Sequence, residues 1–199
     1  WNGPDPAVDN ADGTDGPSIT GPESQSYQYT AADPYRDGFS NTLADVAMEY
    51  WKKDLRGIVN GVPSSAEDPA FWQHMVTFGI GLGVEGAIDP VDAWTAASNG
   101  TAIAWADPEL TDPAKLDDLL HAAVNSRGGF FTASVPDTFA TELSDTLAAI
   151  MNRTESSSSS VAANSTRLDA GTLVYQARFD SDDWSGQLLA YKVDSNGEL

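Results

Sequence analysis

Cysteine is absent from this sequence of 199 residues. Zinc fingers with cysteine ligands, iron–sulfur clusters, redox dithiols and cysteine nucleophiles are therefore excluded. The sequence also lacks an apolar run of the roughly 18 residues that a membrane-spanning helix requires. It begins at Trp1 without a charged segment followed by an apolar stretch, so it shows no signal peptide, and we expect it to be a fragment of a longer protein.

Basic residues are scarce, since 10 Lys and Arg stand against 30 Asp and Glu and give a net charge of −20. Affinity for nucleic acid depends on clustered basic side chains, so this charge excludes a nucleic-acid partner. It also argues against binding to an anionic membrane surface. Protein partners and divalent cations remain as ligand classes. Hydrophobic residues make up 41% of the chain, which is typical of a folded protein.

Catalytic motifs are missing as well. The two histidines, His74 and His121, lack the spacing of paired metal ligands, so we do not expect a histidine-based metal site. The serine-hydrolase motif GxSxG does not occur, and no Asp or Glu is singled out as a general acid or base. We therefore expect the protein to act by binding and not as an enzyme.

The first 38 residues hold 10 Gly or Pro, and their seven acidic residues face a single basic one, which predicts a long acidic loop. Within this loop Asp9, Asp12 and Asp15 lie on a glycine-bent stretch, and such oxygen ligands suit Ca²⁺. The spacing differs from that of an EF-hand loop. A solvated acidic loop without an ion is the alternative interpretation, and the sequence leaves both open.

Apolar residues recur at helical spacing in two segments. Ser40 is a candidate N-cap, and the stripe that follows it consists of Leu43, Val46, Ala47, Tyr50 and Trp51. A second helix is expected to begin at Asp112-Pro113 and to end at Gly128-Gly129, where a left-handed residue is favoured. Its predicted buried stripe is Leu116, Leu119, Leu120, Ala123 and Val124. Residues 85–111 are predicted to be irregular, and a third amphipathic helix is predicted after Ser134.

Residues 75–84 alternate between larger apolar residues and small ones, which predicts a β-strand. Gly79, Gly81 and Gly83 share one face, so close packing against a helix or a neighbouring backbone is expected there. We predict a central strand that is buried on both faces, with Phe78 and Ile80 on the face opposite the glycines. A short strand is expected at 130–133, and the alternation of helices with strands indicates an α/β fold.

The composition changes after residue 153. Residues 156–160 are five consecutive serines, and residues 154–166 are predicted to be a flexible Ser-rich linker. Beyond it, residues 173–179 and 187–193 predict two strands joined by a turn. Because one hairpin is only marginally stable by itself, we expect it to belong to a larger β domain.

Five motifs occur in the following order: SNTLADVAMEYW at 40–51, DPAFWQHMVTF at 68–78 with GLG at 81–83, LLHAAVNSRG at 119–128, SVAANST at 160–166, and VYQARFD at 174–180 with WSG at 184–186. Together they resemble the PilC/PilY family, the large pilus-tip and pilus-biogenesis proteins of bacterial type IV pili. The resemblance covers nearly the whole chain.

This resemblance implies that residues 1–153 form the C-terminal half of a von Willebrand factor A-like domain, a doubly wound sheet between helices. It implies that residues 167–199, after the linker, begin a β-propeller. A domain of the first kind holds a divalent ion, Ca²⁺ or Mg²⁺, through a DxSxS motif. That motif is absent from this sequence, so the main ion site is expected upstream of it.

The resemblance also implies a non-enzymatic pilus assembly factor and pilus-tip adhesin that mediates surface attachment and twitching motility. Its expected location is the pilus tip, outer membrane or cell surface of a Gram-negative bacterium, after export. The implied partners are pilin or minor pilins and a host or abiotic surface. Six tryptophans and abundant Asp leave an alternative, an exported carbohydrate-binding or carbohydrate-processing protein, which a row of exposed, coplanar tryptophans would favour.

Overall fold

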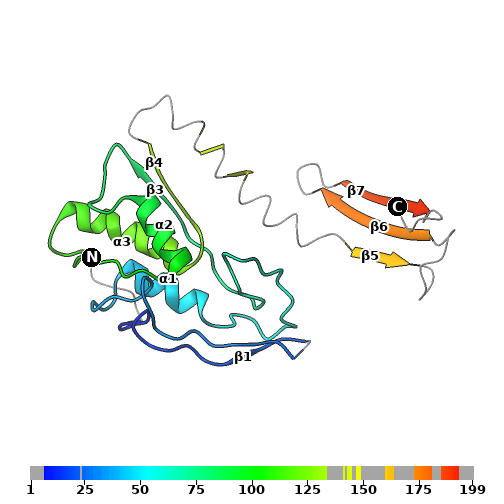
Figure 1. Cartoon of the computed structure of the whole chain (residues 1–199), viewed down its shortest axis with the longest axis horizontal. Coiled ribbons are helices and arrows are strands. Elements are labelled where there is room, and N and C mark those ends of the chain that lie inside the picture. Colours follow the sequence, from blue (N-terminus) through cyan, green and yellow to red (C-terminus); the bar gives the residue numbers. More distant parts are fainter. Residues whose placement is uncertain are drawn as a thin grey trace. The chain divides into compact units, whose positions relative to one another are not determined.

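The computed structural model describes residues 7–22, 24–133, 160–163, 173–180 and 185–192, and positions 141, 143, 144, 147 and 148. Contacts between Cα atoms divide the chain into two units, Trp1–Thr146 (unit 1) and Leu147–Leu199 (unit 2), and each is described by itself. Figure 1 shows helices and short strands in unit 1 and an antiparallel sheet in unit 2. The described residues therefore form a mixed α/β structure with small sheets.

The elements of unit 1 are β1 (Ile19–Thr20), β2 (Ser26–Tyr27), α1 (Leu43–Trp51), β3 (Phe78–Leu82), α2 (Pro90–Asn99), α3 (Asp112–Asn125) and β4 (Gly129–Ala133). Those of unit 2 are β5 (Ser160–Ala163), β6 (Leu173–Asp180) and β7 (Ser185–Lys192). Strands β1 and β2 pair antiparallel, whereas β3 and β4 pair parallel. In unit 2 the strand order is β5-β6-β7, and both pairings are antiparallel.

Helix α1 begins two residues later than the sequence indicates, because its N-cap is Thr42 and not Ser40. The Thr42 hydroxyl accepts from the Asp45 backbone N–H, and the Asp45 carboxylate accepts from the Thr42 backbone N–H, which completes a capping box. The predicted buried stripe is partly wrong, since Tyr50 is 44% exposed. The residues that are buried are Ala44, Asp45, Ala47, Met48 and Trp51. The buried face of α1 therefore includes Asp45, which the predicted apolar stripe did not.

Helix α3 has Thr111 as its N-cap, one residue before the predicted Asp112, and Pro113 lies in its first turn. The left-handed residue after the helix is Arg127, with a φ of 57°, and not the predicted glycine pair. Gly128 is required for another reason: a Cβ there would lie 1.7 Å from the backbone oxygen of Thr77. The backbones at Gly128 and Thr77 therefore approach closely, immediately before β4 and β3 pair.

Helix α2 corrects the prediction that residues 85–111 are irregular. Asp89 caps it by accepting from the Val91 backbone N–H, Pro90 occupies its first turn, and Gly100 ends it with a φ of 74°. Only alanines of this helix, Ala93 and Ala96, are buried. Because it buries so little apolar surface, its apolar spacing is weak, and only the caps signal it in the sequence.

Strand β3 is shorter and more exposed than predicted. Its glycine face is packed closely, since a Cβ on Gly79 would lie 2.9 Å from Leu119 of α3 and 2.8 Å from Phe130 of β4. The other face is open, because Ile80 is 40% exposed, so the prediction of burial on both faces is wrong. Among the described residues β3 has one partner, β4, and the strand predicted at 130–133 is confirmed by β4.

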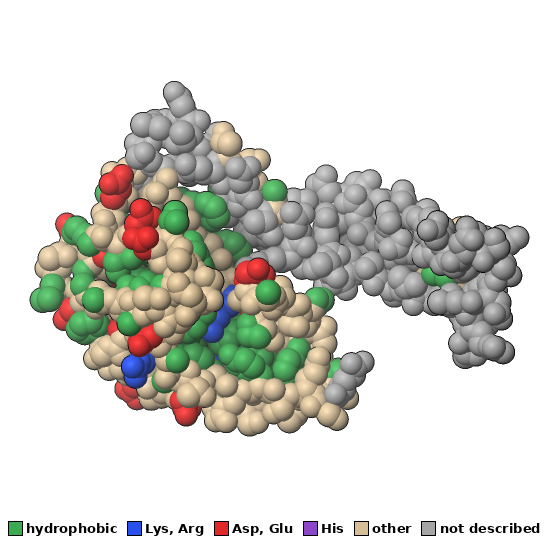
Figure 2. Space-filling model, in the orientation of Figure 1, with side chains coloured by type: hydrophobic (Ala, Val, Ile, Leu, Met, Phe, Trp, Pro, Cys, Tyr) green, Lys and Arg blue, Asp and Glu red, His purple; other side chains and the backbone are tan. Residues whose placement is uncertain are grey.

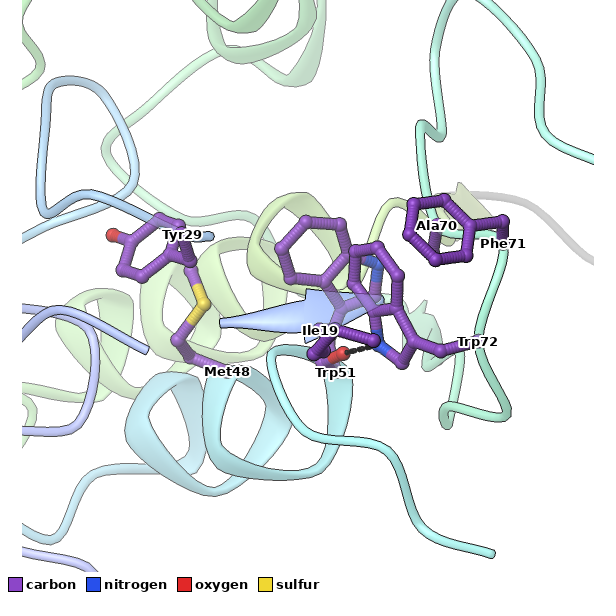
Figure 3. Close-up of a cluster of buried hydrophobic side chains, with 7 residues drawn as sticks. All are labelled: Ile19, Tyr29, Met48, Trp51, Ala70, Phe71 and Trp72. Carbon is purple, nitrogen blue, oxygen red and sulfur yellow. Dashed lines mark hydrogen bonds between the residues drawn. The ribbon is translucent and has the colours of Figure 1, made fainter. Parts of the chain in front are cut away.

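The main hydrophobic cluster of unit 1 lies between α1, the N-terminal segment and the segment before β3 (Figure 3). The rings of Trp51 and Trp72 meet edge-on at 5.4 Å, and Trp72 Nε1 donates to the Trp51 backbone oxygen over 2.8 Å. The buried members are Ile19, Tyr29, Met48, Trp51, Ala70, Phe71 and Trp72. Two of the sequence motifs, at 40–51 and 68–78, thus supply most of one core.

A buried guanidinium joins this cluster to the end of α3. The Cζ atom of Arg127 lies 3.8 Å from the ring centres of both Tyr35 and Trp51, so the cation is held between two aromatic faces. Its Nη1 donates to the backbone oxygen of Asn125. Burial lowers the pKa of Arg127, and the neighbouring tyrosines oppose this effect.

In unit 2 the predicted pair of strands is confirmed by β6 and β7, where Leu173 lies opposite Lys192 and Asp180 opposite Ser185. The third strand, β5, was not predicted and falls within the Ser-rich stretch; its Val161 pairs with Gln176. The rest of that stretch, 154–159 and 164–166, lies outside the described residues, as does the predicted helix start at Ser134. Positions 141, 143, 144, 147 and 148 are helical.

Replacing Gly128 by alanine should destabilise unit 1, because the added Cβ would lie 1.7 Å from a backbone atom of Thr77, which cannot rotate away as the end of a flexible side chain can. We expect a loss of about 1–3 kcal/mol or more in the free energy of unfolding, measured by urea titration followed by tryptophan fluorescence. Gly61→Ala is the matched control, since nothing lies within 4 Å of its added Cβ. Equal stability of the two variants would contradict the close approach.

Candidate metal centre

Three side chains from separate parts of unit 1 meet at one point: Asp12 from the N-terminal segment, Asp37 from the segment before α1, and His121 from α3. One ligand atom from each lies within 4.8 Å of the others. The side chains of Asp12, Asp37 and His121 are 0%, 6% and 1% exposed. This group can hold a metal ion.

Hydrogen bonds to its neighbours fix the position of Asp12. Its backbone N–H donates to Asp45 Oδ1 of α1 over 3.2 Å. The Asp45 carboxylate thus accepts from Asp12 as well as from the N-cap residue Thr42. The carboxylate Oδ1 of Asp12 accepts from the Asp37 backbone N–H at 3.1 Å, and Oδ2 accepts from Asn125 Nδ2 of α3 at 3.1 Å. The hydroxyl of Tyr29 donates to the Asp12 backbone oxygen. The buried carboxylate of Asp12 therefore has Oδ1 toward the segment before α1 and Oδ2 toward α3.

The side chain of Asp37 is held by its own turn. Its Oδ1 accepts from the Phe39 backbone N–H at 2.8 Å, and its backbone oxygen accepts from Asn10 Nδ2. The second carboxylate oxygen, Oδ2, lies 3.5 Å from His121 Nδ1. Asp37 thus has Oδ2 facing the imidazole, while Oδ1 is hydrogen-bonded within its own turn.

The imidazole of His121 is fixed on its face and on one edge. The indole of Trp105 stacks on it at 4.0 Å with the two planes 8° apart, and Trp105 Nε1 donates to the Pro34 backbone oxygen. His121 Nε2 lies 2.8 Å from the Tyr35 backbone oxygen and 3.6 Å from Asp12 Oδ2. Because a carbonyl oxygen only accepts, Nε2 carries the hydrogen. The other ring nitrogen, Nδ1, therefore faces Asp37.

Negative charge accumulates around this imidazole. Burial raises the pKa of Asp12 from 3.8 to about 6; the His121 charge opposes this rise, and the Asp37 charge adds to it. Burial also raises the pKa of Asp118, although its carboxylate accepts from the Leu43 and Ala44 backbone N–H groups at the start of α1. Burial likewise raises the pKa of Asp45. Several carboxylates thus share a poorly hydrated region in which a cation would be stabilised.

Of the residues predicted as Ca²⁺ ligands, the structure brings only Asp12 to this centre. Asp9 is exposed, with a φ of 50°, and the Asp15 carboxylate accepts from the Ala31 backbone N–H. The sequence lacks paired-histidine spacing and predicted no histidine-based metal site, whereas the candidate group of the structure includes His121. No short-range motif marks His121 or Asp37, because their approach depends on how distant segments pack.

Comparison with known proteins relates this chain to bacterial factors of type IV pilus biogenesis. It is 34% identical over 230 residues to the type IV pilus biogenesis factor PilY1 of Pseudomonas aeruginosa strain UCBPP-PA14, and 34% identical over 223 residues to that of strain PAK. These alignments cover 98% and 97% of the chain but 19% of each relative, so the chain spans about a fifth of the length of the curated relatives it matches.

The chain is therefore homologous to PilY1 over nearly its whole length, which confirms the resemblance to the PilC/PilY family. No protein-family model matches the chain, and no solved structure matches it. Among the described residues, no helix is long and apolar enough to cross a membrane.

The raised pKa of Asp12 predicts an unusual pH dependence of stability when a chelator is present. Between about pH 4 and 6 the folded state keeps a proton on Asp12 that the unfolded state has lost, so the free energy of unfolding should fall as pH rises. A pKa change from 3.8 to about 6 corresponds to about 3 kcal/mol. Urea titrations at several pH values in this range measure the slope.

Asp12→Asn cannot titrate, so this variant should lose most of that slope even if its absolute stability is lower. Asp9→Asn is the matched control, because Asp9 is exposed and Asn tolerates its left-handed backbone equally well. The control should keep the slope of the unmodified chain. Parallel pH profiles for all three proteins would show that Asp12 does not carry the effect.

Proposed function

We propose that this chain is a segment of an exported, non-enzymatic type IV pilus assembly factor, which also acts as an adhesin at the pilus tip or cell surface. The observation that carries the proposal is the identity of 34% to PilY1 over 98% of the chain. Surface attachment and twitching motility depend on such a factor in this proposal. The proposal includes a divalent ion, Ca²⁺ or Mg²⁺, bound by the whole protein through a DxSxS motif that this sequence does not contain.

The finer fold assignment is part of the same proposal. Residues 1–153 would be part of a von Willebrand factor A-like domain, and the parallel pair β3–β4 with α3 packed on its glycine face supports this. Residues 167–199 would begin a β-propeller, and the antiparallel strands β6 and β7 support that. The boundary at the Ser-rich residues 154–166 stays a prediction.

The partners we propose are pilin or minor pilins on one side and a host or abiotic surface on the other. The net charge of −20 supports protein or cation partners over nucleic acid. On the face of unit 1 that Figure 2 shows, acidic side chains outnumber basic ones. A Gram-negative pilus tip, outer membrane or cell surface is the proposed location.

The carbohydrate alternative loses its main support among the described residues. Trp51 and Trp72 are fully buried in the hydrophobic cluster, and Trp105 is 8% exposed and stacks on His121. Sugar sites present aromatic faces to solvent, and these three indoles do not. Trp94 is half-buried and packs against the cluster of Ala93, Trp105, Leu120 and Val124, and the remaining two, Trp1 and Trp184, lie outside the described residues. We therefore favour the pilus function.

Deleting the gene that encodes this chain in its source bacterium should reduce surface piliation, adhesion and twitching together. Electron-microscopic counts of pili, attachment assays and twitching-zone diameters measure the three effects. Complementation with the intact gene should restore all three, whereas a version lacking residues 7–133 should not, because those residues form the described core of unit 1.

A version carrying Gly61→Ala is the matched control, since its added Cβ meets nothing, and it should restore all three phenotypes. Normal piliation, adhesion and twitching in the deletion strain would overturn the proposed function. Loss of growth without loss of pili would overturn it as well.

A further inference from the structure

We propose that Asp12, Asp37 and His121 bind one first-row divalent transition ion, Zn²⁺ or Mn²⁺, which fastens the N-terminal acidic segment to α3. This inference does not depend on the pilus function. It rests on the hydrogen-bond pattern of His121, on the Asp37 carboxylate oxygen that faces the ring, and on a buried oxygen of Asn125 without a hydrogen-bond partner.

The two ring nitrogens of His121 face different groups. His121 Nε2 donates to the Tyr35 backbone oxygen at 2.8 Å, as the ring N–H of a metal-ligating histidine commonly donates to a backbone carbonyl, which fixes its tautomer. Whenever Nδ1 carries no proton, its lone pair points away from the ring at that edge. Opposite it, at 3.5 Å, is Asp37 Oδ2, another acceptor. Two acceptors facing each other require a proton or a cation between them.

The distance favours a metal ion over a shared proton. A charge-assisted hydrogen bond between imidazolium and carboxylate has a nitrogen–oxygen distance of roughly 2.7–2.9 Å. Two ligands bound at about 2.1 Å to one tetrahedral ion lie roughly 3.4 Å apart. Asp37 Oδ2 lies 3.5 Å from Nδ1, which is longer than a hydrogen bond and close to a ligand–ligand distance. Asp12 Oδ2 lies 3.6 Å from the other ring nitrogen, Nε2, and Asp12 joins the group because its ligand atom lies within 4.8 Å of those of Asp37 and His121.

Backbone N–H groups orient the carboxylates of Asp12 and Asp37. In each, Oδ1 accepts from a backbone N–H: that of Asp37 for Asp12, and that of Phe39 for Asp37. These bonds orient both groups, so that Asp37 Oδ2 faces Nδ1 of the imidazole. Asp12 Oδ2 lies near Nε2 and also accepts from Asn125 Nδ2. The nearby ammonium of Lys52 donates to the Ala11 and Thr14 backbone oxygens and to the Thr14 hydroxyl. The ammonium of Lys52 is therefore bonded to the backbone and hydroxyl oxygens of Ala11 and Thr14.

An independent observation is the side chain of Asn125, which is fully buried. Its Nδ2 donates to Asp12 Oδ2 and to the Ala44 backbone oxygen, so its carboxamide lies against the cluster. Its Oδ1 is buried and has no hydrogen-bond partner in the described part of the chain. Such an orphaned acceptor is costly unless a donor reaches it. A water molecule on the ion would supply that donor.

The donor set identifies the class of ion. Ca²⁺ prefers six to eight oxygen ligands, whereas this centre offers two carboxylates and an imidazole nitrogen. Imidazole and carboxylate together suit Zn²⁺ and related first-row ions. The centre proposed here therefore differs from the Ca²⁺ loop at Asp9, Asp12 and Asp15 that the sequence suggests, in both its residues and its ion.

The test uses the purified 199-residue chain. After treatment with a chelator, it is dialysed against Zn²⁺, Mn²⁺ or Ca²⁺, and bound metal is measured by mass spectrometry and titration calorimetry. We expect about one Zn²⁺ or Mn²⁺ per chain and no retained Ca²⁺. Asp37→Asn should weaken binding at least tenfold, because it removes a ligand charge but keeps the acceptor for the Phe39 N–H.

The matched control is the double variant Asp9→Asn/Asp15→Asn, which also removes negative charge from the acidic region and should bind like the unmodified chain. Equal weakening of both variants would mean that only general charge matters, and would overturn the site. Retention of Ca²⁺ in preference to Zn²⁺ and Mn²⁺ would overturn the class of ion. Failure to retain any of the three would overturn the proposal.

A second measurement needs no variant and so does not depend on whether Asp37→Asn folds. The chain has two histidines, and the nitrogen resonances of His121 should shift on addition of Zn²⁺, with the larger change at Nδ1. His74, which contacts Asp68 and not this cluster, serves as the internal reference and should not move. An unchanged His121 spectrum, or one of a doubly protonated ring, would overturn the proposal.

Discussion

The rest of unit 1 depends on the burial of one carboxylate, that of Asp12. It is fully buried, yet it lies in a segment with few apolar residues of its own. What holds that segment in place is the set of hydrogen bonds that join Asp12 to Asp45 of α1, to Asn125 of α3 and to the Asp37 backbone. A buried charge is costly without partners, so once the segment is docked each of these bonds is needed. The acidic segment is therefore an integral part of the core.

Helices α1 and α3 are joined by the same kind of interaction at a second place. Asp118 of α3 accepts from the Leu43 and Ala44 backbone N–H groups, which are donors that the first turn of α1 cannot use internally. Thr42 and Asp45 satisfy further donors at the same end. Helix α1 thus has three carboxyl or hydroxyl groups at its positive end, as the helix dipole favours. Polar contacts, as much as apolar burial, define how these helices pack.

The sequence predicts well those features that depend on neighbouring residues. The spacing of apolar residues locates α1 and α3, and alternation locates β3, β6 and β7, each within a few residues. The caps are harder to predict, because several neighbouring residues have side chains that can accept from the first turn of a helix. The N-caps are Thr42 and Thr111, where the sequence suggests Ser40 and Asp112. Helix α2 buries only alanines and so lacks a clear stripe. The grouping of Asp12, Asp37 and His121 was beyond prediction, because no spacing along the chain relates residues that meet only after α3 packs beside the N-terminal segment.

The bond between Asp12 and Asn125 spans 113 positions of the chain. Closing so long a loop costs conformational entropy before any of the contacts it enables can form, and proteins rich in such contacts fold slowly. During synthesis, the N-terminal segment can meet α1 first, but its docking is complete only when α3 has emerged. Until then, like charges among its carboxylates oppose its collapse.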